Sequence, residues 1–405
     1  MNMRAPITAL ITALTLVASQ AEAAAARWVG SWGASPAPPM SGAGPRATPT
    51  FNNQTLVQVV RLSAGGGRLR LRLTNEYGAR PLAIGAARVA LIDADGAILP
   101  GSERAVRFSG GGTATLSPGA PLVSDPVALP TKALARLSIS LFLPGDTGGC
   151  TCHMSGSELV QVSSPGDFTE KPVPPATGPA QYRAFLSGVE VETAAAPGPV
   201  IVAFGDSITD GYLSTTGANR RWPDRLAERL TARLPGRAVA VVNAGIGGNR
   251  VLSEGAIAIF GQSALSRFDR DVLSIPGATH VIVLEGVNDL GASRTAPPTA
   301  AELIAGYRQL IARAHAHGLK IIGATILPYG GAGYFGAPGE AQRQAINTWI
   351  RTGHEFDGVT DLDAATRDPA KPERLRADLQ SGDWLHPNDA GYRVMGEAVD
   401  LGLFR

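Results

Sequence analysis

The chain has 405 residues, of which 44% are hydrophobic and 17% are charged, and its formal net charge at pH 7 is +2. This composition is typical of a globular protein with two or more domains and excludes a disordered chain. The basic residues are scattered along the sequence and only four of them are lysine, so we expect binding neither to nucleic acid nor to a membrane surface.

The N-terminus has the pattern of an export signal. Arg4 precedes an apolar run at residues 7–17, and Ala21 and Ala23 then form a small-x-small cleavage pattern. This predicts a secretory signal peptide at residues 1–23, since the apolar run is too short to cross a bilayer. The cleavage pattern contains no cysteine for lipid attachment, so we expect a secreted or periplasmic protein without a stable membrane anchor.

The first half of the chain, residues 27–193, consists of short alternating segments separated by glycine or proline. The expected strands are residues 56–62, 68–73, 88–92, 105–108, 137–143 and 185–191. Because no helical periodicity interrupts them, they predict an antiparallel β-sandwich of jelly-roll-like shape. Trp28, Trp32 and Tyr77 could line a binding cleft, but for each of these aromatic side chains packing in the core is the favoured interpretation.

Two cysteines, Cys150 and Cys152, are separated by one residue and followed by His153. Export makes a disulfide possible, so a local bridge and a pair of free thiols on an exposed loop both stay open. A metal site is less favoured, because the three ligands would come from one short loop without a second cluster.

After a linker expected at residues 194–199, the pattern changes to apolar runs that alternate with amphipathic segments. The expected strands are residues 200–204, 238–243, 280–284, 319–326 and 359–362. The expected helices are residues 222–234, 263–273, 299–317, 340–354 and 388–401. Strands alternating with helices over residues 200–405 predict an α/β domain with a doubly wound parallel sheet between two helical layers.

Ser207 follows the first of these strands, within the sequence Gly205-Asp206-Ser207. Open α/β sheets place their ligand sites at the carboxyl ends of strands, so this serine is a candidate nucleophile. The alternative is a simple turn in which Ser207 caps the next helix.

The next two strands also end in residues that suit a reactive site. Gly247 and Gly248 let a loop pass close to a ligand and direct backbone N–H groups toward it. A dinucleotide fingerprint would require glycine at position 250, which is Arg250. Asn288 is either a turn residue or a neutral amide that donates to an oxyanion.

Asp383 and His386 lie three residues apart just before the last expected helix. This spacing lets the carboxylate hold the imidazole and stabilise its charged form. For the other five histidines a structural role is favoured; these are His153, His280, His315, His317 and His354.

These four stretches, in the same order, resemble the four functional blocks of the SGNH (GDSL-type) hydrolases, over residues 198–405. The resemblance is to secreted bacterial esterase-like members with an N-terminal β domain, and it implies a flavodoxin-like α/β/α catalytic domain. It also implies that Ser207 is the nucleophile, that His386 is its general base and that Asp383 orients His386. The implied oxyanion hole comprises the Ser207 N–H, the Gly248 N–H and the Asn288 side chain, with Gly247 as the alternative glycine.

The expected function is hydrolysis of short-chain acyl esters, acetyl esters above all, of carbohydrates or similar alcohols, without a metal or an organic cofactor. The alternatives are a lipase or lysophospholipase, a non-catalytic polysaccharide-binding protein, and a metal-dependent hydrolase. The residues available for a metal would be Asp206, Asp210, Asp289, Asp383 and His386. The expected partner is a small-molecule or saccharide ester, and the sequence leaves the oligomeric state open.

Overall fold

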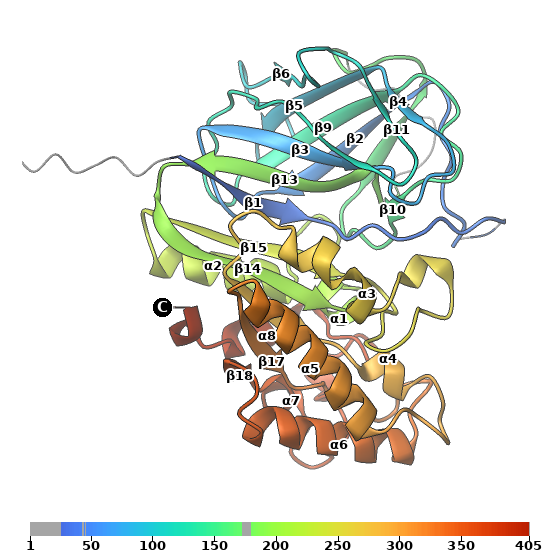
Figure 1. The fold of residues 1–405 in the computed structure, drawn as a ribbon, viewed down its shortest axis with the longest axis vertical. Helices are drawn as coiled ribbons and strands as arrows, with labels where there is room; N and C mark the ends of the chain where they lie inside the picture. Colours follow the sequence, from blue (N-terminus) through green and yellow to red (C-terminus); the bar gives the residue numbers. More distant parts are fainter. Residues whose placement is uncertain (1–25, 43, 45, 172–179, 405) are drawn as a thin grey trace, which may run out of the picture.

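The computed structural model describes residues 26–42, 44, 46–171 and 180–404. A region of antiparallel strands lies against a region of alternating strands and helices (Figure 1). The signal peptide expected at residues 1–23 lies outside the described residues. Among the helices that the structure describes, none combines the length and the apolar character needed to cross a membrane.

Two larger sheets build the N-terminal region. The first has the order β1 (Arg27–Gly33), β13 (Leu186–Thr193), β3 (Arg68–Thr74) and β8 (Pro121–Val123). The second has the order β11 (Val160–Pro165), β2 (Gln54–Arg61), β9 (Arg136–Leu143), β5 (Ala86–Ile92) and β6 (Arg104–Ala105). Two short pairs complete the region: β4 (Leu82–Ile84) with β7 (Ala114–Leu116), and β10 (Cys152–His153) with β12 (Arg183–Ala184).

The alternating sequence pattern explains how these sheets pack. Leu69 and Leu71 on β3 share one hydrophobic cluster with Ile139 and Leu141 on β9, because every second side chain of a strand points to the same face. On the opposite face of β3, Arg70 pairs with Glu190 of β13 at 2.5 Å. The prediction of an antiparallel β region is therefore confirmed.

The structure corrects the expectation for the cysteines. Cys150 and Cys152 form a disulfide, and both side chains are buried rather than carried on an exposed loop. The burial arises because β10 pairs with β12 and Ala37 forms a bridge to Cys152 on the other side.

The C-terminal region contains one parallel sheet of five strands. They are β14 (Ala196–Gly205), β15 (Arg237–Gly245), β16 (His280–Leu284), β17 (Lys320–Ala324) and β18 (Gly358–Thr360). Their spatial order is β15-β14-β16-β17-β18, which is the 2-1-3-4-5 order of flavodoxin-like folds. The predicted α/β class is confirmed, and the apolar run of β14 is continuous because Ile201 through Phe204 are all fully buried.

Helices connect these strands and cover the sheet (Figure 1). They are α1 (Ser207–Asp210), α2 (Trp222–Arg233), α3 (Ala264–Phe268), α4 (Val287–Leu290), α5 (Ala300–Ala316), α6 (Ala337–Thr352), α7 (Leu362–Thr366) and α8 (Asp389–Ala398). The predicted start at Thr299 reflects a capping box, in which Thr299 and Glu302 satisfy each other's backbone N–H groups. Helix α2 packs against α8, and α5 packs against α6.

The segment expected to be a linker is largely part of the sheet. Strand β14 already begins at Ala196, which is paired with Arg237 of β15. Its pairing with β16 begins only at Ile201, so the preceding residues are paired on one side. Pro197 and Pro199 fit there because proline, which lacks an N–H, is tolerated where a strand has a free edge. The prediction of a linker at residues 194–199 was wrong for most of this segment, because proline and glycine are also typical of flexible connections.

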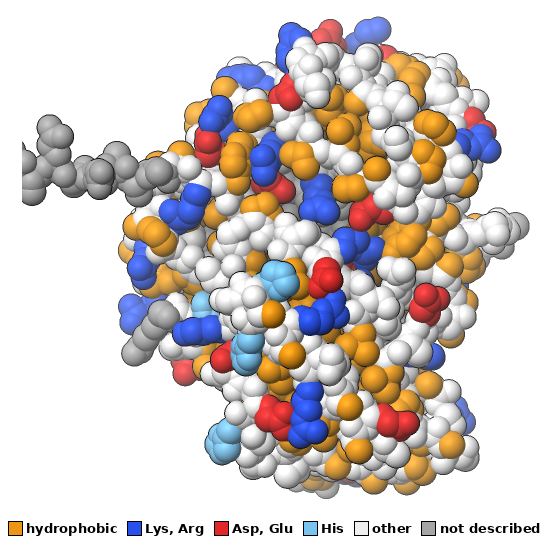
Figure 2. All heavy atoms as spheres, in the orientation of Figure 1, with side chains coloured by type: hydrophobic (Ala, Val, Ile, Leu, Met, Phe, Trp, Pro, Cys, Tyr) orange, Lys and Arg blue, Asp and Glu red, His pale blue; other side chains and the backbone are white. Residues whose placement is uncertain are grey.

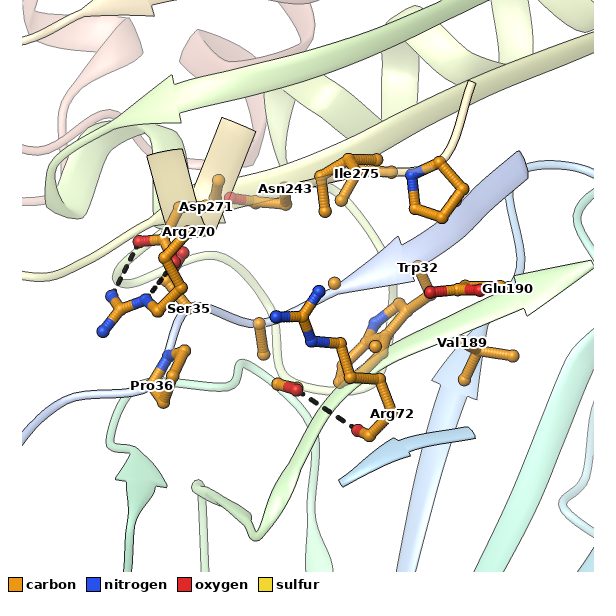
Figure 3. A pocket seen from close by; sticks show the side chains of 18 of the residues that line it. Trp32, Ser35, Pro36, Arg72, Val189, Glu190, Asn243, Arg270, Asp271 and Ile275 are labelled. Carbon is orange, nitrogen blue, oxygen red and sulfur yellow. Dashed lines mark hydrogen bonds and ion pairs between the residues drawn. The ribbon is translucent and has the colours of Figure 1, made fainter. Parts of the chain in front are cut away.

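The two regions share an extensive contact. Strand β1 lies along β15, and the Gly30 N–H donates to Pro276 O at 2.9 Å. The Val241 N–H donates to Ser63 Oγ at 3.0 Å. A small cavity of about 30 Å³ lies in this contact. Figure 3 shows Trp32 on its β side and Ile275 on the other. The β region is therefore packed directly against the edge of the parallel sheet.

Candidate active site

Ser207 is the first residue of helix α1, at the carboxyl end of the central strand β14. The helix is capped by Asp206, whose Oδ1 accepts the Ile208 N–H at 2.9 Å. The alternative in which Ser207 caps the helix is therefore wrong. Because Asp206 fills the cap position, the Ser207 hydroxyl is left available for another partner.

That partner is His386. Ser207 Oγ lies 2.9 Å from His386 Nε2, and His386 Nδ1 lies 2.6 Å from Asp383 Oδ2. Ser207 and His386 are 7% and 9% exposed, so both are largely shielded but reachable. The Tyr212 ring packs edge-on against the imidazole, with 4.8 Å between the centroids. The three residues that the sequence singled out are thus joined by hydrogen bonds, although Asp383 lies 176 positions after Ser207 in the sequence.

The turn around Asp383 keeps this carboxylate ionised. Burial has the largest single influence and would raise the pKa of Asp383, but several hydrogen bonds outweigh it. They come from the His386 ring and from the backbone N–H groups of Leu385 and His386, the latter two both at 2.9 Å. The pKa of Asp383 is consequently lowered to about 2.

The structure also brings the expected oxyanion donors to the same place. Gly247, Gly248 and Asn288 line a cavity together with Ser207. Asn288 Nδ2 donates to Asn249 O at 3.0 Å and lies 3.4 Å from Asp206 Oδ2. The second contact is long for a hydrogen bond, so one amide N–H remains weakly engaged. Gly248 has a φ of +76° and a side chain there would meet the Phe260 ring, which explains the glycine.

Arg267 ties together the strand ends beneath this site, and sequence reasoning missed this role. Its fully buried guanidinium donates to Gly205 O at 2.8 Å and to Ala244 O at 2.7 Å. It also binds Asp271 at 2.9 Å and approaches Glu285 at 3.3 Å. The only sequence signal was the charged run at residues 267–271, because burial cannot be seen in a polar pattern.

Three buried carboxyl groups lie around Arg267 and the site. Burial raises the pKa of Asp206, and the nearby charge of Asp289 also acts to raise it. Burial likewise raises the pKa of Glu285, and the charges of Asp206 and Asp289 act in the same direction. Burial also raises the pKa of Asp289 to about 6, against the opposing effect of the Val251 and Leu252 N–H groups. None of the three carboxyls lines the cavity beside Ser207; Asp206 caps α1, and Asp289 accepts the backbone N–H groups of Val251 and Leu252.

The residues considered for a metal are engaged elsewhere. Asp206 caps α1, Asp289 accepts the N–H groups of Val251 and Leu252, and Asp210 pairs with His153. Within the described part of the chain, no three His, Cys, Asp or Glu side chains are grouped so that they could hold an ion.

The cavity beside Ser207 has a volume of about 560 Å³. Three of its residues, Arg46, Met154 and Ser155, come from the β region. None of the aromatic residues considered for this role lines it; Trp32 is buried, and the Tyr77 hydroxyl donates to Gln262 at 3.0 Å. Met154 and Ser155 directly follow β10, which contains Cys152 of the disulfide and His153.

His153 links the β region to the helix that carries Ser207. Its Nε2 lies 2.9 Å from Asp210 Oδ1, and its Nδ1 lies 3.0 Å from Ser35 O. Burial is the largest influence and would lower the pKa of His153, but the charge and hydrogen bond of Asp210 outweigh it and the pKa is raised. The structural role expected for His153 is therefore a buried contact between the two regions.

Comparison with known proteins agrees with this architecture. Residues 203–394 match the GDSL-like lipase/acylhydrolase family. The C-terminal domain belongs to this family, which confirms the resemblance drawn from the four sequence blocks. The protein is therefore a carboxylic ester hydrolase.

Several solved structures are similar to about half of this chain. A lipase/acylhydrolase from Enterococcus faecalis is 25% identical, covering 49% of this chain and 92% of its own, with a TM-score of 0.39. A carbohydrate acetylesterase family member from Sinorhizobium meliloti is 18% identical (49% and 94% covered, TM-score 0.41). An acetyl xylan esterase from Geobacillus stearothermophilus is 21% identical (50% and 94% covered, TM-score 0.39). No curated protein matches the sequence.

Proposed function

We propose that the protein is a serine esterase in which Ser207 is the nucleophile, His386 the general base and Asp383 the residue that orients His386. One observation carries this proposal: the continuous hydrogen-bonded line from Ser207 Oγ through His386 to Asp383, at the wall of a cavity. A base within hydrogen-bond reach of a serine, itself held by a carboxylate, is the arrangement that activates a hydroxyl for acyl transfer.

The reaction would proceed in two halves. Ser207 Oγ attacks the ester carbonyl while His386 Nε2 accepts its proton, and the ionised Asp383 stabilises the resulting imidazolium. His386 then protonates the leaving alcohol, and a water molecule repeats the sequence on the acyl-enzyme. The weakly engaged N–H of Asn288, together with the Ser207 and Gly248 N–H groups, would stabilise the oxyanion.

We propose short acyl chains, acetyl above all, on a carbohydrate or a similar alcohol as substrates. The cavity volume of about 560 Å³ lies within the roughly 300–1,000 Å³ of small-ligand sites.

The alternative is a lipase or lysophospholipase. It is favoured by the exposed side chains of Tyr212 and Leu213, 43% and 49% exposed, over which a longer acyl chain could lie. We also propose a secreted or periplasmic location, based on the signal peptide expected at residues 1–23.

Hydrolysis of 4-nitrophenyl acetate, butyrate and laurate by the wild type and by Ser207→Ala tests both parts of the proposal. We expect activity on the short esters that EDTA does not affect and that the alanine variant lacks. Activity that survives in folded Ser207→Ala would contradict the proposed nucleophile. A preference for laurate over acetate would replace the short-chain proposal with the lipase alternative.

A further inference from the structure

Arg250 differs from the buried arginines of the C-terminal region in having no carboxylate partner among the described residues. Arg221, Arg267 and Arg343 are buried, and each of them binds a carboxylate within 3 Å. Arg250 is half-buried in the cavity wall, yet its guanidinium forms no hydrogen bond or ion pair with any described residue. Its Nε is shielded from solvent without a partner. A guanidinium that is partly desolvated and unpaired is costly unless a ligand compensates for it.

A second arginine lines the same cavity from the opposite region of the molecule. Arg46 belongs to the β region, is exposed, and likewise has no ion-pair partner among the described residues. The fifteen residues that line the cavity include both arginines and no aspartate or glutamate. The two guanidinium groups therefore give the cavity wall a positive charge, whatever the protonation state of His386.

Asp289 interacts with Arg250 but does not form an ion pair that would neutralise its guanidinium. The positive charge of Arg250 opposes the rise that burial causes in the pKa of Asp289, so the two groups interact through space. The Asp289 carboxylate, however, accepts the backbone N–H groups of Val251 and Leu252 at 2.8 and 3.1 Å and lies outside the cavity wall. It forms no ion pair with Arg250, so the guanidinium remains available to a ligand in the cavity.

We propose that Arg250, assisted by Arg46, forms an anion subsite, and that the preferred ester carries an acidic group on its alcohol part. This inference rests on the proposed function, and the acid is assigned to the alcohol because the proposed acyl group, acetyl, carries no charge. The planar guanidinium matches a carboxylate with two parallel hydrogen bonds. The substrate class would then be acyl esters of acidic alcohols, acidic saccharides among them.

Matched pairs of esters test the inference. The first pair is 4-acetoxybenzoate, which is anionic, and 4-acetoxybenzamide, its neutral counterpart of similar shape. The second pair is an acetylated oligouronate and an acetylated neutral oligosaccharide, in which the acid group extends over a longer distance. The readout is the ratio of kcat/KM for the anionic ester to that for the neutral ester, after correction for spontaneous hydrolysis.

In the wild type we expect this ratio to exceed one in at least one pair, and to fall as salt is added because salt screens the attraction. We expect Arg250→Gln to lower it roughly tenfold, the factor typical of a lost hydrogen bond to a charged group. Arg250→Lys, which keeps the charge but not the planar fork, should give an intermediate ratio. Arg46→Gln, at an exposed position where folding is not at risk, should lower it by a smaller factor.

Arg233→Gln is the matched control, since it removes one positive charge from an exposed position in the last turn of α2, outside the cavity. It should leave the ratio as in the wild type. A ratio of one or below in both pairs, or a ratio that neither Arg250→Gln nor Arg46→Gln changes, would overturn the anion subsite. Such a result would be distinct from failure of the proposed function, which would show as activity of Ser207→Ala on 4-nitrophenyl acetate.

Discussion

The β region and the α/β region differ in how their sequences relate to the site. Every motif of the proposed catalytic site lies in the α/β region, at the end of a strand or just before the last helix. The β region has no such motif, yet it supplies Arg46, Met154 and Ser155 to the cavity and the His153 contact to α1. A region without a motif can thus become part of a site through packing alone.

The physical origin of this difference lies in the sheets. In a parallel sheet the strand ends meet at one edge, so residues that follow strands are brought together by the topology itself. In the antiparallel β region, loops lie at both ends of the sheets, and only the packing of β1 along β15 decides which of them faces Ser207. Four predictions test which region contributes to catalysis, to stability and to substrate selectivity.

The largest expected effect is on turnover. His386→Ala removes the proposed base, and we expect kcat on 4-nitrophenyl acetate to fall by about 10³- to 10⁴-fold, with unchanged thermal unfolding. His317→Ala is the control, because His317 is exposed at the end of α5. A His386→Ala variant that keeps more than a few per cent of activity would place the chemistry elsewhere, and the assignment of catalysis to the α/β region would fail with it.

The next effect is on stability. Arg267→Met removes the buried guanidinium that bonds to Glu285 and to the carbonyl oxygens of Gly205 and Ala244, and it leaves Asp271 paired with Arg270 alone. We expect it to lower the free energy of unfolding by about 3–5 kcal/mol. The same substitution at Arg68 in the β region, whose side chain is 50% exposed beside Glu192, should cost much less because solvent screens an exposed ion pair. Urea unfolding measures both. Equal losses would contradict the view that Arg267 supports the strand ends.

A smaller effect concerns the contact between the regions. Because the pKa of His153 is raised above 6.5, its charged pair with Asp210 contributes fully below about pH 6.5. That contribution is lost as the pH rises through the raised folded value. We expect His153→Gln to lose about 1–3 kcal/mol at pH 6 and less at pH 9. A loss that does not vary with pH, measured by urea unfolding at both values, would show that the pair is not charged in the folded protein.

The smallest expected effect is on acyl-chain selectivity. Met154→Ala removes apolar surface from the cavity wall, so kcat/KM for 4-nitrophenyl butyrate should fall a few-fold relative to acetate, in line with about 0.8 kcal/mol per CH₂ group. Met40→Ala, a substitution of the same type in the β region outside this cavity, provides the comparison. An unchanged ratio for Met154→Ala would confine the β region to a structural role.

Much of the fold could be predicted from local patterns. The alternation at Arg68–Thr74 and the continuous apolar run of β14 specify a strand with one buried face and a strand with two. The capping box at Thr299 specifies the start of α5. Residues 196–199 were misassigned because a proline-rich strand end that is paired on one side has the composition of a linker.

The sequence by itself determined the parallel sheet and the candidates Ser207, Asp383 and His386, because strand ends and a three-residue spacing are local properties. Tertiary structure alone decided that Arg267 is buried, that His153 meets Asp210, and that Arg46 and Arg250 share one cavity. Each of these depends on residues far apart in the chain. The physical reason is that a polar side chain has the same sequence signature whether it faces water or a buried partner, and only packing distinguishes the two.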